Sequence, residues 1–213
     1  VELPTVEKRD LSFFSAIQVD ILLKAITDDP LYTLIKITVF YGLRRSEVLG
    51  LKWSMVDFTN DTIRIAHTVV KINSIVRKDK TKNSSSKRTY PMIDNMKELL
   101  LNLKRRQLMN RKLFGKEYYE SDYIFVWDDG RPYRPDYVTH RFSRILELND
   151  LPHIRFHDLR HSCASVLLSK GFSLKDVQEW LGHSDIKMTA NVYGHLDIER
   201  KKHIAEGINT IFS

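Results

Sequence analysis

Residues 181–195 read LGHSDIKMTANVYGH, which places Tyr193 ten residues after His183. A second polar stretch, HDLRH at residues 157–161, lies upstream, and a third, GLRRSE at residues 42–47, lies much further upstream. Together these stretches supply two arginines, at least two histidines and one tyrosine. If the fold brings them together, all of these side chains could contact one small anion.

The residue types in this set fit a phosphate. The planar guanidinium of arginine matches two phosphate oxygens at once and does not lose its proton. A tyrosine held in line with the phosphorus could attack it and form a covalent adduct. The set therefore favours phosphoryl transfer through a covalent tyrosine intermediate.

The composition is that of a globular chain with a polyanionic partner. Its 213 residues are enough for one large or two small domains with a real core. The net charge of +7 favours nucleic acid first and an acidic membrane surface second, although an inert basic surface fits the charge equally well. The lone Cys163 excludes an internal disulfide and fits a reducing compartment. Its apolar neighbours indicate core packing and not a nucleophile.

The sequence gives no sign of a membrane protein. No stretch approaches the ~20 apolar residues of a transmembrane helix. The start of the chain, residues 1–4, is not a signal peptide. Because the first residue is Val1 and not methionine, we expect a fragment or a processed product.

Hydrophobic periodicity predicts a mostly helical chain that follows a linker at residues 1–12. Apolar residues recur at helical spacing in segments that begin near residues 14, 31, 94, 135, 158 and 173. The expected helices are 14–26, 31–41, 94–113, 135–148, 158–170 and 173–180, with another at 187–193. Gly42 is expected to end the second helix, and Ser46 to cap a short helix that follows it.

Three β-branched segments interrupt the helices. Residues 62–70, 72–76 and 88–92 predict a small three-stranded antiparallel sheet, with Pro91 on an exposed edge. Between the last two strands, residues 77–87 form a basic, serine-rich hairpin loop. The predicted fold class is therefore mainly α with a small three-stranded antiparallel β-sheet (α+β).

Taken singly, the candidate residues also have ordinary structural explanations. Glu47 could hold a neighbouring arginine or cap a helix. His157 and Arg160 share one face at a helix start, where the helix end also attracts an anion, but a capped start with a solvated arginine fits as well. A histidine after a glycine often caps a helix, and a lone tyrosine is usually amphipathic core.

The joint pattern changes this balance. GLRxSE, a basic β-hairpin, HDLRHS, LGH and then a tyrosine follow one another in order, and this pattern resembles the tyrosine recombinase (phage integrase) superfamily across residues 13–213. The chain looks most like the integrases of conjugative transposons and temperate phages. The resemblance implies the catalytic-domain fold of that family and a site-specific DNA recombinase that cleaves and rejoins strands through a 3′-phosphotyrosine intermediate.

The resemblance also implies a role for each matching residue. The catalytic positions fall on Arg44, His157, Arg160, His183 and Tyr193, with Glu47 as a supporting acidic residue. In the family, arginines stabilise the charge on the phosphate, a histidine accepts the tyrosine proton and a lysine on the hairpin protonates the leaving oxygen. That lysine falls on Lys82, with Lys80 as the competitor because Ser84-Ser85-Ser86 leaves the register open. No metal and no cofactor is implied.

Basic side chains in two regions are expected to contact the DNA backbone. The residues beside the first arginine and around the sheet are Arg45, Arg64, Lys71, Arg77, Lys78, Lys80, Lys82, Lys87 and Arg88. The helical group is Lys104, Arg105, Arg106, Arg111 and Lys112. Each of these positions could equally be a solvated surface charge.

The resemblance extends to organisation and partners. We expect a catalytic domain at residues 13–196 and a tail at residues 197–213 that is exchanged between protomers or packs on its own domain. The partners would be double-stranded DNA and further copies of the chain in a homotetramer. The resemblance also implies a location in the bacterial cytoplasm, on DNA. Family members usually carry DNA-binding domains before this one, and we expect this chain to lack them.

Three other readings stay open from the sequence. A type IB topoisomerase or a hairpin-end resolvase would use the same chemistry. A catalytically silent DNA-binding domain would keep only the scaffold. A metal-dependent nuclease could use the metal-ligand spacing of His157 and His161, with His183 or Asp158, although no HExxH glutamate and no cysteine set accompanies them.

Overall fold

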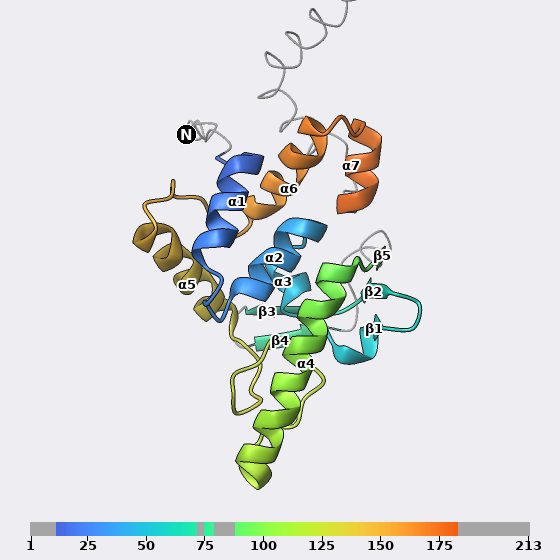
Figure 1. Ribbon diagram of the computed structural model, residues 1–213, viewed down its shortest axis with the longest axis vertical. Coiled ribbons are helices and arrows are strands. Elements are labelled where there is room, and N and C mark those ends of the chain that lie inside the picture. The colour runs from blue at the N-terminus through green and yellow to red at the C-terminus, as the bar shows by residue number, and fades with distance from the viewer. Residues whose placement is uncertain (1–11, 72–74, 79–87, 183–213) are drawn as a thin grey trace, which may run out of the picture.

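The computed structural model describes residues 12–71, 75–78 and 88–182, with the backbone alone between residues 70 and 78. Helices make up most of it (Figure 1). They are α1 (Ala16–Ala25), α2 (Tyr32–Tyr41), α3 (Arg45–Val48), α4 (Asp94–Phe114), α5 (Pro135–Leu148), α6 (Asp158–Ser169) and α7 (Leu174–Leu181). The predicted helices are confirmed to within a few residues at each end, except 187–193, which lies outside the described residues.

Local sequence signals set several helix ends. Ser15 caps α1 by accepting a hydrogen bond from the Gln18 amide, and the Gln18 side chain accepts one from the Ser15 amide in return. Gly42 ends α2 with φ 60° and ψ 38°, the left-handed region that favours glycine. The expected cap at Ser46 is wrong, because Arg44 occupies the N-cap and Ser46 lies inside α3.

The strands form two small sheets. β1 (Val56–Asp57), β2 (Thr62–Ile65) and β5 (Arg88–Pro91) make a three-stranded antiparallel sheet in the order β1-β2-β5. β3 (Thr68–Lys71) and β4 (Ile75–Lys78) pair separately as an antiparallel hairpin. A three-stranded antiparallel sheet is therefore confirmed, with Pro91 on an edge strand, but its members differ from the prediction.

The difference arises at His67. The predicted strand 62–70 is two strands, β2 and β3, in two different sheets. Between them the His67 ring is buried and its Nε2 lies 2.9 Å from Tyr123 Oη. The backbone of His67 also packs closely on Gly50, where an added Cβ would lie 2.3 Å from the His67 carbonyl oxygen. Tertiary packing therefore bends a segment whose alternation alone favours one strand.

The core of the helical part is built around α2. This helix packs against α1, α3 and α6, and it buries Leu34, Ile35, Ile37 and Tyr41 completely. α6 is also buried along most of its length, but its buried residues include Asp158, Arg160 and His161. Because a buried charge is costly unless it is paired, the α2–α6 contact marks the place to look for a functional site.

Candidate active site

The first arginine of the site follows directly from the end of α2. After Gly42 turns the chain, Arg44 takes the N-cap position of α3 with its side chain one third exposed. Its backbone N–H donates to Glu47 Oε2 at 2.8 Å, and its Nη1 donates to Glu47 Oε1 at 2.8 Å. Glu47 therefore holds a neighbouring arginine and caps the helix at the same time, as its spacing suggested.

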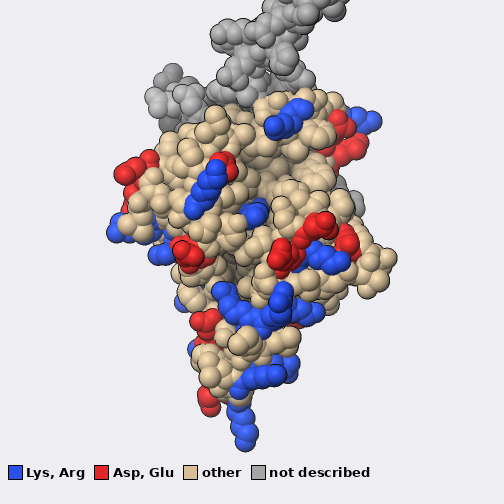
Figure 2. Space-filling view, in the orientation of Figure 1, with Lys and Arg blue, Asp and Glu red and all other residues tan. Residues whose placement is uncertain are grey.

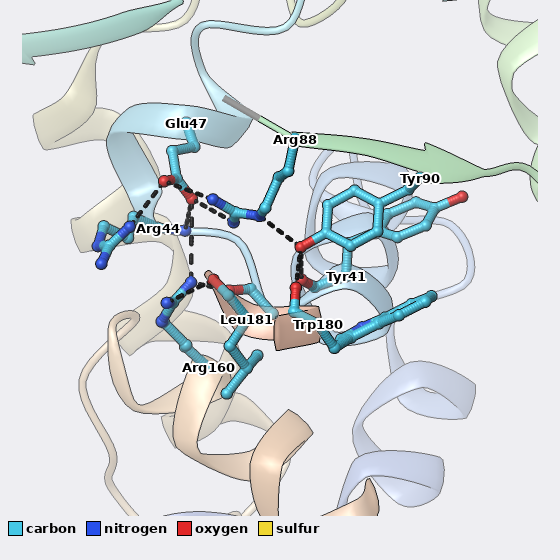
Figure 3. Close-up of polar contacts among 9 residues, drawn as sticks. Tyr41, Arg44, Glu47, Arg88, Tyr90, Arg160, Trp180 and Leu181 are labelled. Carbon is cyan, nitrogen blue, oxygen red and sulfur yellow. Dashed lines mark hydrogen bonds and ion pairs between the residues drawn. The ribbon is translucent and has the colours of Figure 1, made fainter. Parts of the chain in front are cut away.

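Glu47 is the meeting point of three arginines (Figure 3). Besides Arg44, Arg88 Nη1 and Nη2 donate to its two oxygens at 3.2 and 3.0 Å, and Arg160 Nη1 lies 4.0 Å from Oε2. The carboxylate is only 2% exposed. Burial alone would raise the pKa of Glu47, but the Arg88 guanidinium and the bonds from Arg44 outweigh it and lower that pKa. The charge is therefore present at neutral pH, and the cluster stays net positive.

The second arginine, Arg160, reaches the same cluster from α6. It is 1% exposed, and its Nη1 and Nη2 donate to the carbonyl oxygens of Gly42 and Leu181 at 2.6 and 2.7 Å. Burial and the nearby Arg44 lower the pKa of Arg160 to about 9, which still leaves the guanidinium charged at neutral pH. Arg160 thus joins the ends of α2 and α7 and stands beside Arg44.

The Arg88 side chain is largely buried and bonds to two residues of the site. Its guanidinium is 10% exposed, and besides Glu47 it bonds to the Tyr90 hydroxyl through Nε. Sequence reasoning placed Arg88 among the DNA-contacting cations and did not assign Tyr90 any part. The period of a strand offered a signal, because Arg88 and Tyr90 lie two residues apart on one face of β5 and Tyr90 is a large aromatic residue.

His157 lies at the N-terminus of α6, at the surface, next to His161. The two rings meet edge to face with centroids 5.6 Å apart. Loss of water around the ring, followed by the charges of His161 and Arg160, lowers the pKa of His157 to about 4. Burial likewise lowers the pKa of His161, whose Nδ1 has no hydrogen-bond partner among the described residues. His157 is therefore neutral at physiological pH and able to accept a proton.

Asp158, the acidic residue next to His157, is held by Arg155 and not by the arginine cluster. Asp158 is buried at the start of α6 and accepts hydrogen bonds from the Arg155 backbone N–H, Nε and Nη2 at 2.8 to 3.0 Å. Burial alone would raise the pKa of Asp158, but the bonds from Arg155 outweigh it and lower that pKa. Asp158 is thus occupied by Arg155 while Arg160 points to the arginine cluster.

The remaining catalytic candidates lie outside the described residues. These are the hairpin lysine Lys82 and its competitor Lys80, together with His183 and Tyr193. Lys87 lies outside as well, and only the backbone is described at Lys71, Arg77 and Lys78. The described chain ends at Gly182, the C-cap of α7, one residue before His183. The site assembled by the described residues is therefore Arg44, Glu47, Arg88, His157 and Arg160.

The cations predicted for DNA contact have varied surroundings. Arg45 is half-buried and bonds to Thr139 Oγ1 on α5, whereas Arg64 is exposed on β2. Lys104 lies over the rings of Trp53 and Phe58 at 5.5 and 5.3 Å. Figure 2 shows Lys and Arg gathered over the lower half of the molecule, where α4 runs in Figure 1. The other members of the helical group, Arg105, Arg106, Arg111 and Lys112, are exposed.

An apolar groove opens beside α2. It has a volume of about 620 Å³ and lies between α1, α2, α6 and α7. Its walls include Leu23, Phe40, Leu167, Phe172 and Trp180. Figure 2 shows a largely uncharged surface in the upper half of the molecule, where these four helices lie in Figure 1. Cys163 forms part of the wall and is buried, and burial raises the pKa of its thiol to about 12, in keeping with core packing.

Two features of the described residues bear on the alternatives. Within residues 12–69 and 88–182, no group of three or more His, Cys, Asp and Glu side chains is arranged to hold a metal ion. Across the same part of the chain, the helices are all too short or too polar to cross a membrane.

Comparison with known proteins gives consistent matches. The profile described as "Phage integrase family" matches residues 13–200. A protein of Caldanaerobacter subterraneus subsp. tengcongensis named "Tyrosine recombinase XerC-like" is 30% identical, over 95% of this chain and 55% of that protein. The chain spans about half the length of the curated relatives it matches.

Solved structures share the fold. The Tn1549 transposon integrase in complex with transposon right end DNA superposes with a TM-score of 0.74 at 23% identity, over 92% of this chain and 68% of that one. A lambda integrase tetramer bound to a Holliday junction gives a TM-score of 0.65 at 19% identity, over 90% of this chain and 50% of that one.

Proposed function

Because the chain belongs to the phage integrase family, we propose that it cleaves and rejoins DNA strands at a specific site through a covalent bond to Tyr193. The observation that carries this proposal is the pairing of Arg44 and Arg160 across the buried Glu47 carboxylate. The two arginines are far apart in the sequence, yet both stand at the junction of α2, α3 and α6. A phosphate is the ligand for which two adjacent guanidinium groups are best suited.

The arginines would stabilise the charge of the transferring phosphate. During transfer, negative charge on the non-bridging oxygens must be stabilised, and donors already fixed in place do this without reorganisation. Glu47 keeps Arg44 in place through two hydrogen bonds, and carbonyl oxygens keep Arg160 in place through two more. Loss of one such donor typically costs ~3–4 kcal/mol of transition-state stabilisation.

Proton transfers complete the reaction. The Tyr193 phenol has a reference pKa of ~10, so it must give up its proton as it attacks. We assign this proton to His157, which is neutral at physiological pH. The phenol oxygen forms a bond to phosphorus while the bond from phosphorus to the 5′ oxygen breaks. Lys82 would protonate that leaving oxygen, and His183 would donate a hydrogen bond to the phosphate. The reverse steps rejoin a strand.

We further propose that the chain acts as a homotetramer on double-stranded DNA in a bacterial cell. The family membership and the relatives named above support this proposal. In the proposed tetramer, the tail at residues 197–213 of one copy enters the apolar groove of the next copy. The groove offers a mostly apolar wall between α1 and α7, although Asp20, Lys36 and Asp176 are among its lining residues. The tail carries Ile204, Ile208, Ile211 and Phe212 at roughly helical spacing.

A nicked suicide substrate tests the proposed chemistry. The wild-type chain should form a denaturant-resistant protein–DNA adduct in excess chelator, and Tyr193→Phe should form none. A wild type that binds the DNA but never forms the adduct would indicate a silent DNA-binding domain. Cleavage that is lost with the chelator and retained in Tyr193→Phe would indicate a metal-dependent nuclease.

A further inference from the structure

Arg88 uses every nitrogen of its guanidinium on protein groups. Nη1 and Nη2 form a two-pronged contact with the Glu47 carboxylate, and Nε bonds to the Tyr90 hydroxyl. The side chain is 10% exposed, and it leaves β5 at the first residue of the strand. A contact of this kind requires the planar fork of arginine, because a lysine offers one nitrogen on a flexible stem.

Tyr90 continues the contact from Arg88 to the last turn of α7. Its hydroxyl accepts from Arg88 Nε and donates to the carbonyl oxygen of Trp180, with the Tyr41 carbonyl oxygen 3.3 Å away. The Tyr90 ring is buried against those of Tyr41 and Trp180, with both centroid distances 4.9 Å. β5 is thus bonded to the end of a helix that lies ninety residues further along the chain.

The end of α7 is consequently held at two neighbouring carbonyl groups. Tyr90 binds the carbonyl oxygen of Trp180, and Arg160 Nη2 binds that of Leu181 at 2.7 Å. The last carbonyl groups of a helix have no partner within the helix, so they are free to accept such bonds. Figure 3 shows the whole chain of contacts, from Arg44 through Glu47 and Arg88 to Tyr90 and Trp180.

We infer that Arg88 and Tyr90 are positioning residues of the strand-cleavage reaction. Arg88 fixes the orientation of the Glu47 carboxylate, and Glu47 in turn aims Arg44 and stands beside Arg160. Tyr90 fixes the end of α7, from which the chain leads to His183 and Tyr193. This inference rests on the proposed function, and it gives Arg88 a task distinct from phosphate contact, since its guanidinium is turned toward Glu47 and Tyr90 and is only 10% exposed.

Three variants and one control test the inference. Arg88→Lys keeps the charge but loses the fork, Arg88→Ala removes both, and Tyr90→Phe removes only the hydroxyl. The control is Arg141→Ala on α5, which removes a partly buried ion pair between Arg141 Nη2 and Asp29 Oδ2 at 2.6 Å. The measurements are the single-turnover rate of adduct formation at saturating suicide substrate, the Kd for that substrate, and the thermal midpoint.

The positioning role predicts a split between rate and binding. Arg88→Lys should lose adduct rate on the order of a hundred-fold, as misplaced catalytic groups do, while the Kd stays within about two-fold of the wild type. Tyr90→Phe should fall between Arg88→Lys and the wild type. Arg141→Ala should lower the thermal midpoint and leave the rate at saturation unchanged.

The outcomes separate this inference from the proposed function. If the wild type forms the adduct and Arg88→Lys forms it at the same rate, the inference is overturned and the proposed function stands. The inference is also overturned if Arg141→Ala loses as much thermal midpoint as Arg88→Lys and shows the same loss of adduct rate, because the rate loss would then follow from lower stability. A wild type that forms no adduct overturns the proposed function and takes this inference with it. If Arg88→Ala does not fold, Arg88→Lys and Tyr90→Phe decide the question.

Discussion

Arg44 and Glu47 are joined twice, once through the backbone N–H of Arg44 and once through its guanidinium, with both contacts at 2.8 Å. The first bond caps α3 and the second orients the exposed side chain. Helix capping and arginine orientation therefore depend on one buried carboxylate. Any change at Glu47 acts on the stability of the fold and on the direction of Arg44 together.

Replacement of Glu47 by Gln should reduce stability and adduct rate. Removal of one partner from a buried ion pair typically costs about 3–5 kcal/mol, because the remaining charges lose their counterion. Denaturant unfolding measures this loss, and Glu147→Gln in the exposed pair with Arg144 is the control, expected to cost less than about 1 kcal/mol. Equal losses in the two variants would contradict the central place of Glu47.

The contribution of Glu47 to folding stability should also depend on pH. Its pKa is lower in the folded chain than the ordinary 4.5, so the unfolded chain binds the proton first. The full contribution is present above about pH 4.5 and is lost as the pH falls through the folded pKa. The stability difference between the wild type and Glu47→Gln should therefore shrink below that pH. A difference that stays constant into strong acid would refute this account.

His157 should titrate far below an ordinary histidine. An imidazole NMR titration of the free chain should place its pKa near 4 and not near 6.5. Because the unfolded chain takes up the proton first, His157 should lower folding stability as the pH falls from about 6.5 to 4 and have no effect above that range. A bound DNA phosphate should raise the pKa. A midpoint near 6.5 without DNA would show that His157 is not neutralised by its surroundings.

Gly42→Ala should destabilise the chain through two separate effects. A residue with a Cβ at φ 60° costs about 1–2 kcal/mol in the backbone. In addition, the new Cβ would lie 2.0 Å from Leu181 Cδ2. Gly171→Ala is the control, since Gly171 also has a positive φ but open space around it. Urea unfolding should show a larger loss at Gly42 than at Gly171.

A second-site change then isolates the contact with Leu181. In a Leu181→Ala background the collision is removed, so Gly42→Ala should cost no more than Gly171→Ala. Failure of this double variant to recover any stability would mean that the ends of α2 and α7 do not pack as described.

Arg64→Ala should weaken DNA binding in a salt-dependent way. Arg64 is exposed on β2, and we propose that it contacts a phosphate. Loss of one phosphate contact reduces the slope of log Kd against log salt by about 0.9. Lys24→Ala, on an exposed pair with Asp20 at the surface of α1, is the control and should leave the slope unchanged. Identical slopes for Arg64→Ala and the wild type would remove Arg64 from the DNA-binding surface.

The helices could be predicted because their end signals are local. Gly42, Ser15 and Ser173 each end or begin a helix through contacts with residues at most four positions away. The break at His67 could not be predicted, because it depends on Gly50 and Tyr123, which are distant in sequence. Alternation of side chains specifies faces of a strand, whereas the place where a strand leaves a sheet depends on what packs against it.

The site shows the same division. Spacing alone linked Arg44 with Glu47, and the resemblance to a family linked Arg44 with Arg160. The inward direction of Arg88 was not foreseen, because it lies beside a basic run whose charges suggested a solvated surface. A buried partner such as Glu47, forty-one residues away, becomes visible only in three dimensions.

The anchoring of α7 has a consequence for substitutions at the end of this helix. Tyr90 and Arg160 grip this helix through main-chain oxygens of Trp180 and Leu181, which every amino acid possesses. A substitution at position 180 can therefore keep the hydrogen bond to the Tyr90 hydroxyl while it changes the groove wall and the ring contact with Tyr90. The attachment of α7 and the shape of the groove thus depend on different atoms of the same residue.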